Sequence, residues 1–396
     1  MKKVLALILV VALCVGLVAC GNSKPAETKP EDKPTTNAES VSNGGENLPG
    51  EGKSILYYCA FIGDFGLADM GHRAAKAAAE KYGYELTLVE YGQDKSQAVN
   101  SLVDALDTKH YDIVMAMGWY ITDTVIEMSK NGEWSDITFI LYDTAPGTDF
   151  SGTDNIYGVA FAQNEGSFLV AVYSALMSKT GKIGAVINMD APITNDFGTG
   201  WLCGYRYARD ELGMKDLDMM YTYMGELTVQ GDYESVNVVM DNGCDYVYNV
   251  GGSVALGAMQ AADEKGGVDA GKFIIGTDYD QYTYFESVGD VQGYKSMVTS
   301  MLKNIEPCVA LIMENLHGEA EGIVPGNHTY GIAEGGTGLC ENDWYKQNTP
   351  EDVQKQISEI SNKIANGEIE VVSYFDFPTY DEFANYRDNK DATFSK

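Results

Sequence analysis

The chain has few positive charges and lacks the short motifs that mark common catalytic sites. Its 27 Lys and Arg residues stand against 58 Asp and Glu residues, giving a formal net charge of −31. Such an acidic surface repels phosphate backbones and anionic headgroups, which disfavours nucleic acid and direct polybasic membrane binding. The sequence contains no G-x-S-x-G, H-E-x-x-H, Walker or post-strand G-x-G-x-x-G motif. We therefore expect no enzyme.

Cysteine and histidine are scarce and show no metal-ligand spacing. Two of the seven cysteines, Cys14 and Cys20, lie near the N-terminus. The other five are Cys59, Cys203, Cys244, Cys308 and Cys340. They form no C-x-x-C pair and have no ligand spacing with the four histidines, so we predict no metal site and no cofactor. Each lies beside apolar or aromatic residues, which favours small buried side chains over a disulfide.

The long apolar run near the N-terminus is too short to span a membrane. It covers residues 4–19 and follows Lys2 and Lys3, whereas a membrane-spanning helix needs about 20 apolar residues. This pattern predicts a signal peptide over residues 1–19. The ending Leu17-Val18-Ala19-Cys20 resembles the lipobox of bacterial lipoproteins, which implies that Cys20 is lipidated and begins the mature chain. The alternative is an ordinary signal peptide with a chance cysteine.

The segment after Cys20 has too few apolar residues to fold. Residues 21–50 contain four of the ten prolines and almost nothing apolar, so they cannot offset the entropy of ordering the chain. We predict a disordered tether over residues 20–50. The protein is then held at the extracytoplasmic face of the cell membrane by its lipid anchor alone.

The remainder, residues 52–396, alternates short β-rich runs with helical segments. One series extends from SILYYCAFIG to ITFILYD, and a second from KIGAVINM to KFIIGTD. This length exceeds one hydrophobic core, and nearly all-apolar strands are typical of parallel sheets covered by helices. We predict an α/β fold of two similar lobes with a ligand cleft between them. The N-terminal lobe comprises residues 52–160 plus about 279–325, and the C-terminal lobe 161–277 plus about 326–396.

Carboxylates, aromatic rings, glycines and one cation recur where the predicted strands end. Ligands of open α/β sheets bind beyond the carboxyl ends of the strands. Carboxylates accept hydrogen bonds from hydroxyls, aromatic faces stack on rings, and glycine lets the backbone approach a ligand, which together favour a flat, neutral, hydroxyl-bearing ligand. Any one of these residues could instead cap a helix, fill a core or face solvent. The candidates are Asp64, Phe65, Trp119, Asp123, Gly252, Asp278 and Lys303.

Several stretches occur in order between residue 54 and about 372, among them FAQNEGSFLVAVYSALMSKTGKIGAV, GGSVALGAMQAADEKGG, GTDYDQ and YGIAEGGTGL. This ordered set resembles one family, the basic membrane protein or PnrA-like lipoproteins, which are substrate-binding components of nucleoside ABC transporters. The resemblance implies a type I periplasmic-binding-protein fold and a purine-nucleoside ligand.

The resemblance also assigns roles to residues. Asp278 and Lys303 match the ribose-binding Asp and Lys of the family. Asp64 and Asp123 match the Asp residues after the first and third strands, and Gly252 falls where backbone groups line the site.

The chain departs from the family after its first strand. Family members commonly continue that Asp with Ser-Phe-Asn, whereas this chain reads Phe65-Gly66-Leu67-Ala68. Either Phe65 or Trp119 then supplies the stacking face, or the base specificity has changed.

We therefore expect a monomeric substrate-binding lipoprotein that captures a purine nucleoside and delivers it to an ABC permease. A tethered sensory receptor for a small molecule is one alternative. A nucleoside or glycoside hydrolase, with Asp278 and Asp280 as paired acids, is another. Because alternate positions of an extended segment point to opposite sides, these two carboxylates are not expected to face one ligand together.

Overall fold

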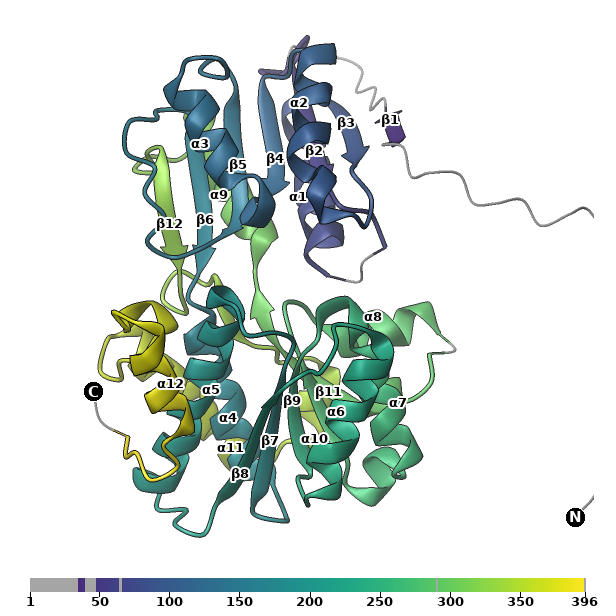
Figure 1. Cartoon of the computed structure of the whole chain (residues 1–396), viewed down its shortest axis with the longest axis vertical. Coiled ribbons are helices and arrows are strands. Elements are labelled where there is room, and N and C mark those ends of the chain that lie inside the picture. Colours follow the sequence, from purple (N-terminus) through teal and green to yellow (C-terminus); the bar gives the residue numbers. More distant parts are fainter. Residues whose placement is uncertain (1–34, 40–47, 64–65, 290, 395–396) are drawn as a thin grey trace, which may run out of the picture. The chain divides into compact units, whose positions relative to one another are not determined.

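The computed structural model describes residues 35–39, 48–63, 66–289 and 291–394 (Figure 1). The predicted signal peptide 1–19, Cys20, Asp64 and Phe65 lie outside the described residues. None of the described helices combines the length and the apolar character that a membrane span needs.

Two sheets, mostly parallel, organise the described residues. The first has the strand order β1-β3-β2-β4-β5-β6-β12, and β1 is antiparallel to its neighbour. Its strands are β1 (Thr35–Glu39), β2 (Ser54–Cys59), β3 (Glu85–Glu90), β4 (Ile113–Met117), β5 (Thr138–Thr144), β6 (Ile156–Phe161) and β12 (Gly326–Tyr330). All six residues of β2 and of β6 are buried, as expected for parallel strands covered on both faces.

The second sheet has the order β13-β11-β10-β9-β7-β8, and β13 is antiparallel to β11. Its strands are β7 (Lys182–Ile187), β8 (Asp218–Tyr223), β9 (Tyr246–Val250), β10 (Phe273–Gly276), β11 (Met297–Lys303) and β13 (Thr337–Leu339). This pair of helix-covered sheets confirms the predicted α/β class with two similar lobes.

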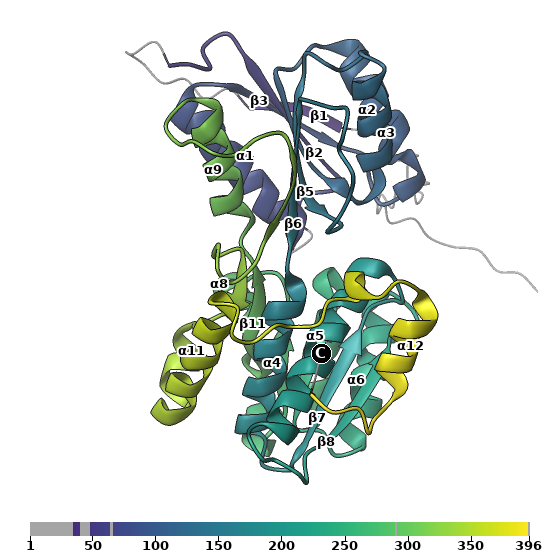
Figure 2. The ribbon, with the colours of Figure 1, turned by 90° about the vertical axis from the view of Figure 1, so that its left-hand side faces the viewer.

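Helices cover both faces of each sheet (Figure 2). On the first sheet, α1 (Leu67–Tyr82) and α9 (Ile305–Leu316) pack on one face, and α2 (Ala98–Thr108) and α3 (Thr122–Lys130) on the other. On the second sheet, one face carries α4 (Gln163–Met177), α5 (Pro192–Asp210) and α11 (Glu351–Ala365), and the other α6 (Val229–Asp241), α7 (Leu256–Glu264) and α8 (Gln281–Val288). The remaining α-helices are α10 (Asp343–Asn348) and α12 (Tyr380–Asp388).

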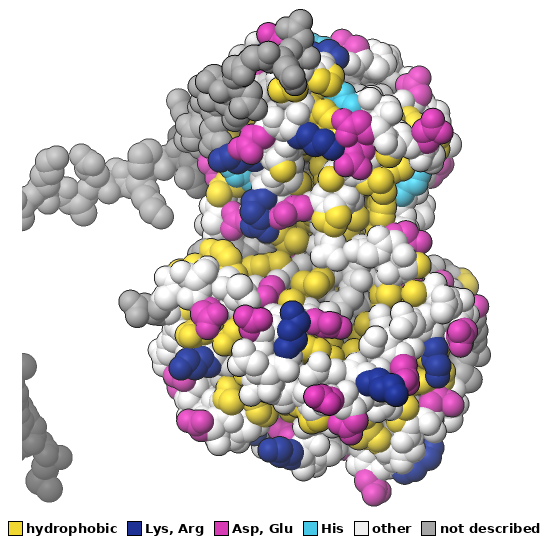
Figure 3. All heavy atoms as spheres, turned by 180° about the vertical axis from the view of Figure 1, so that it is seen from behind, with side chains coloured by type: hydrophobic (Ala, Val, Ile, Leu, Met, Phe, Trp, Pro, Cys, Tyr) yellow, Lys and Arg dark blue, Asp and Glu magenta, His cyan; other side chains and the backbone are white. Residues whose placement is uncertain are grey.

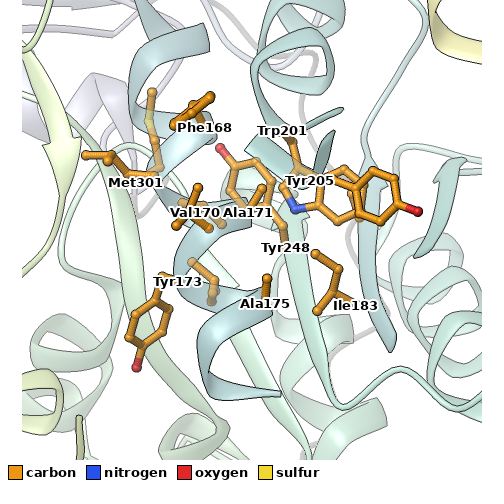
Figure 4. Close-up of a cluster of buried hydrophobic side chains, with 14 of the residues drawn as sticks. Phe168, Val170, Ala171, Tyr173, Ala175, Ile183, Trp201, Tyr205, Tyr248 and Met301 are labelled. Carbon is orange, nitrogen blue, oxygen red and sulfur yellow. The ribbon is translucent and has the colours of Figure 1, made fainter. Parts of the chain in front are cut away.

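Two glycines let α5 approach α4 closely. A Cβ atom at Gly200 would lie 2.0 Å from the carbonyl oxygen of Asn164, and one at Gly204 would lie 2.4 Å from that of Phe168. Figure 4 shows the resulting core, in which Trp201 of α5 packs among the side chains of α4. Close packing on α4 holds α5 in place, and Thr194 and Phe197 near the start of α5 line the cavity described below.

The five cysteines of the described region are buried and carry no disulfide, which confirms that they are small buried side chains. They are Cys59, Cys203, Cys244, Cys308 and Cys340.

The structure departs from the predicted tether in one place. Thr35–Glu39 forms β1, which pairs antiparallel with β3. These five residues therefore have regular structure, whereas disorder was predicted for them. The partner strand β3 would otherwise be the edge of the first sheet, and an edge strand presents unpaired backbone groups to any extended segment nearby.

The lobe boundaries also differ from those predicted. Within the described residues the chain passes between the sheets three times, after β6, after β11 and after β12. Strand β11 and helix α8 belong to the second lobe, whereas β12 returns to the first. The second chain segment of the first lobe is therefore residues 305–330, and not about 279–325 as predicted. An apolar run such as MVTSML predicts a strand, but its sheet is decided by long-range pairing.

Candidate ligand-binding site

A cavity of about 220 Å³ lies where the strands of both sheets end. Residues at or just after the carboxyl ends of β2, β3, β4 and β5 line it from the first lobe, and those of β7, β9, β10 and β11 line it from the second. The lining residues used below are Trp119, Asp143, Asn188, Met189, Thr194, Phe197, Gly252, Thr277, Asp278 and Lys303. Contribution from both lobes is the arrangement predicted from the two strand series.

A buried ion pair crosses from one sheet to the other at this cavity. Lys303, at the end of β11, donates from Nζ to Oδ1 of Asp143 in β5 over 2.6 Å, and both side chains are 1% exposed. The indole Nε1 of Trp119 donates to the other carboxylate oxygen over 2.5 Å. The carboxylate of Asp143 is therefore held by two donors, one from each lobe.

The backbone explains why Asp143 points into the cavity. Its φ is +60°, and the register between β5 and β6 shifts between Tyr142 and Thr144. Such a bulge redirects a side chain, and the left-handed conformation is one that Asp tolerates better than most residues. A strand-end carboxylate is thereby aimed at the cation of the facing sheet.

The cation of Lys303 also contacts an aromatic ring. Its Nζ lies 4.6 Å from the ring centroid of Phe197, which projects from α5 into the cavity. A cation near an aromatic face is attracted by the negative charge of that face, and the attraction grows when water is excluded. Phe197 and Trp119 are two aromatic surfaces on one cavity, contributed by different lobes.

Asp278 occupies the turn between β10 and α8. Its φ is +74°, and its carbonyl oxygen accepts a hydrogen bond from the N–H of Lys303 over 2.8 Å. Gly252 also has a positive φ, +56°, and a Cβ atom there would meet nothing within 4 Å. The second lobe thus offers a half-buried carboxylate and an open stretch of backbone to the same cavity.

Two buried polar atoms of the cavity lining have no hydrogen-bond partner among the described residues. They are Oδ1 of Asn188, directly after β7, and Oγ1 of Thr277, directly after β10. Buried polar groups are rarely left unpaired in folded proteins. A ligand with donor and acceptor groups would satisfy both.

Four of the predicted site residues line the cavity, namely Trp119, Gly252, Asp278 and Lys303. Asp123 is exposed in the first turn of α3 and is not among the lining residues. Asp64 and Phe65 lie outside the described residues, although Gly66 and Leu67 beside them line the cavity.

Sequence reasoning missed two residues that meet in the cavity. Asp143 closes the apolar run ITFILYD and carries the same strand-end pattern as the chosen candidates, so it could have been selected. Phe197 lies inside a helix with buried residues on all sides, and no pattern distinguishes it from a core residue.

The two acids considered for hydrolysis do not meet in the cavity. Asp280 caps α8, where its Oδ1 accepts hydrogen bonds from the N–H of Thr283 and from Nδ2 of Asn342, and it is not a lining residue. Within the described ranges, no group of three or more His, Cys, Asp or Glu side chains could hold a metal ion.

Charges elsewhere on the molecule are mixed. On the face shown in Figure 3, Lys and Arg side chains lie among Asp and Glu side chains rather than in one basic patch of the described residues.

Comparison with known proteins gives one family match. A model described as ABC transporter substrate-binding protein PnrA-like matches residues 53–374. Basic membrane protein A of Borreliella afzelii is 27% identical over 302 residues, which cover 76% of this chain and 84% of that protein. The CD4+ T-cell-stimulating antigen of Listeria monocytogenes is 25% identical over 386 residues, which cover 94% of this chain and 99% of that protein.

Solved structures share the fold. An ABC transporter solute-binding protein of Aeropyrum pernix superposes with a TM-score of 0.70 at 22% identity, covering 84% of this chain and 96% of that one. A second solute-binding protein, from Conexibacter woesei, superposes with a TM-score of 0.62 at 16% identity, and the match covers 81% of this chain and 99% of that one. These similarities confirm the predicted type I periplasmic-binding-protein fold.

Proposed function

Because the chain belongs to the PnrA-like family of ABC transporter substrate-binding proteins, we propose that its interlobe cavity captures a purine nucleoside for delivery to a membrane permease. The observation that carries the proposal is the meeting of Asp278, Lys303 and two aromatic rings on one cavity. The carboxylate of Asp278 accepts hydrogen bonds from the two ribose hydroxyls, since a carboxylate has lone pairs for several donors. Lys303 donates to a ribose oxygen.

The base lies between the aromatic surfaces in this proposal. Trp119 and Phe197 reach the cavity from opposite lobes, and aromatic rings favour offset stacking on flat partners. The unpaired Oδ1 of Asn188 accepts a hydrogen bond from the ligand. Each lobe alone supplies only part of these groups, so capture needs both lobes, and ligand closes them by hinge rotation.

The remainder of the proposal concerns the place of the protein in the cell. Cys20 carries lipid, the segment after it tethers the binding unit, and the protein acts as a monomer at the extracytoplasmic face of the membrane. A tethered receptor is held near its permease at high effective concentration, which favours transfer of ligand.

A thermal-shift screen of residues 21–396 against nucleosides, free bases, sugars and amino acids tests the ligand class. A ligand at 100 times its dissociation constant should stabilise the folded state by about 2.7 kcal/mol. We expect the largest shifts with purine nucleosides. Stabilisation by amino acids or sugars and not by any nucleoside would refute the proposal.

A further inference from the structure

Helix α12 begins after residue 374, where the match to the family ends, and it is fastened along α5 (Figures 1 and 2). The guanidinium of Arg206, a residue 1% exposed, donates from Nη2 to the carbonyl oxygen of Tyr386 over 2.6 Å. Arg209, one turn later in α5, donates to two carbonyl oxygens that follow α12. Phe383 at the centre of α12 is completely buried. The helix is therefore anchored at its C-terminal end and along its inner face.

Tyr380, the first residue of α12, and Arg387, near its last, hold the loop that leads into α5. The hydroxyl of Tyr380 donates to Oδ2 of Asp190, and Nη1 of Arg387 lies 3.6 Å from the same oxygen. The other carboxylate oxygen accepts a hydrogen bond from Nδ2 of Asn195 over 2.7 Å. Both oxygens of Asp190 are thus engaged, and two of these three partners come from α12.

The guanidinium of Arg387 is itself held in place. The Arg387 side chain is 17% exposed, and its guanidinium lies 5.6 Å from the ring centroid of Tyr223 and 5.5 Å from that of Phe383. Two further nitrogens of this group donate to the carboxylate of Asp388. A cation fixed on several sides can position the carboxylate that it faces.

The loop that α12 holds is part of the cavity. Residues 188–195, which comprise the loop after β7 and the first turn of α5, contribute Asn188, Met189 and Thr194 to the lining. The hydroxyl of Thr194 donates to the carbonyl oxygen of Met189 over 2.7 Å, so the loop is a connected unit. Its Asn188 carries the buried Oδ1 atom that has no partner among the described residues. Because Asp190 is two residues from Asn188, the contacts that hold Asp190 also position the Oδ1 atom of Asn188.

We infer that α12 is a clasp that positions the cavity loop 188–195 through Asp190, and that Tyr380 and Arg387 are positioning residues for ligand binding. The part of the inference that concerns affinity rests on the proposed function. A loop pinned from outside the cavity presents its acceptor in one orientation, so less conformational entropy is lost when ligand binds. Loosening the clasp should lower affinity although no ligand contact is removed.

The first arm of the test needs no ligand. Hydrogen exchange of the amides of residues 188–195 is compared in residues 21–396 of wild type, Tyr380→Phe and Arg387→Met. We expect faster exchange in this loop for both variants. Tyr233→Phe is the matched control, because it removes a tyrosine hydroxyl bound to the carboxylate of Glu264 over 2.6 Å at a position outside the cavity lining. Unchanged exchange in both clasp variants would overturn the inference.

The second arm measures affinity by calorimetric titration with guanosine and inosine. Substitutions that act on a site without touching its ligand change binding by about 0.5–2 kcal/mol, which is roughly 2- to 30-fold. We expect a loss in this range for Tyr380→Phe and Arg387→Met, none for Tyr233→Phe, and partial recovery for Arg387→Lys, which restores a cation near Asp190.

The two arms separate failure of the inference from failure of the proposed function. Faster loop exchange with unchanged nucleoside affinity would overturn the role of the clasp in binding. If wild type binds neither nucleoside, the proposed function fails, and the exchange arm alone then decides whether α12 positions the loop.

Discussion

At the scale of single residues, the cavity depends on two aspartates in unusual backbone conformations. Asp143 and Asp278 are the described non-glycine residues with positive φ, and both line the cavity. Residues held in sparsely populated conformations cost roughly 1–3 kcal/mol each and cluster at functional sites. The rest of the fold offsets this cost, which places two carboxylates at one site.

We predict that Asp278→Ala weakens nucleoside binding by on the order of a hundredfold to ten-thousandfold, because two hydrogen bonds to a charged acceptor contribute about 3–6 kcal/mol. A free base lacks ribose and should lose far less affinity. Calorimetric titration of wild type and variant with guanosine and guanine measures both. Equal loss for the two ligands would contradict a ribose-binding role.

We predict that Lys303→Met destabilises the protein by about 3–5 kcal/mol, because it leaves the buried carboxylate of Asp143 without its cation. Urea unfolding gives the change in the free energy of unfolding. Arg73→Met is the control, since the Arg73–Glu306 pair is about half exposed on both sides and such a pair contributes at most about 1 kcal/mol. The double variant Lys303→Met/Asp143→Asn should recover part of the loss; no recovery would argue against an unpaired charge as its cause.

At the scale of elements, buried carboxylates join helices to their neighbours. Asp196 of α5 accepts hydrogen bonds from Gln163 of α4 and from Ser373 and Tyr374, and burial raises its pKa to about 6. Asp232 of α6 accepts hydrogen bonds from Asn249 of β9 and from the N–H of Ala258 in α7, and burial raises its pKa to about 7.

These raised pKa values make stability dependent on pH. Between the unfolded value of 3.8 and the folded value of about 7, folded Asp232 retains a proton that the unfolded chain has lost. Its contribution is thus fully present below pH 3.8 and is lost as pH rises through about 7. Asp210 has the opposite effect on stability. Its hydrogen bond with Arg209 lowers its pKa, so its contribution to the free energy of unfolding is lost as the pH falls into the acid range.

We predict that the free energy of unfolding decreases from pH 5 to pH 8, and that Asp232→Asn reduces this decrease. Urea unfolding at both pH values measures the difference. Asp241→Asn, on the exposed side of the same helix, is the matched control and should behave as wild type does. If the free energy of unfolding decreased equally for wild type and Asp232→Asn between pH 5 and pH 8, Asp232 would not be the cause of the pH dependence.

At the scale of the whole molecule, the proposed function requires the binding unit to stay at the membrane. The described helices offer no membrane span, and the family match confirms the resemblance from which transport was inferred. The lipobox resemblance predicts that Cys20 provides this attachment.

We predict that Cys20→Ala releases the protein from the membrane, because no later apolar run in the chain approaches about 20 residues. Fractionation of cells that express wild type and variant measures release, and mass spectrometry of the mature N-terminus identifies the lipid. Cys14→Ala, within the predicted signal peptide, is the control and should leave attachment unchanged. A mature wild-type chain that starts elsewhere without lipid would refute the prediction.

The sequence alone was enough to predict the α/β class, the two strand series and the family, because strand runs, helical segments and motifs are local patterns. It also selected Trp119, Gly252, Asp278 and Lys303, since each follows a strand and strand ends meet at one edge of a sheet. Asp123 also follows a strand but does not line this cavity, because position after a strand does not decide which way a helical side chain points.

Tertiary structure alone decided which sheet each late strand joins and which charges meet. The pairing of β11 with β10 and of β12 with β6 depends on backbone contacts between distant segments. Asp143 and Lys303 are 160 residues apart, and their meeting depends on a bulge in β5 and on a second sheet that ends opposite it. Likewise, the contact of α12 with Asp190 spans 190 residues. Local propensity carries no information about such distances, because these contacts form only when the whole core is packed.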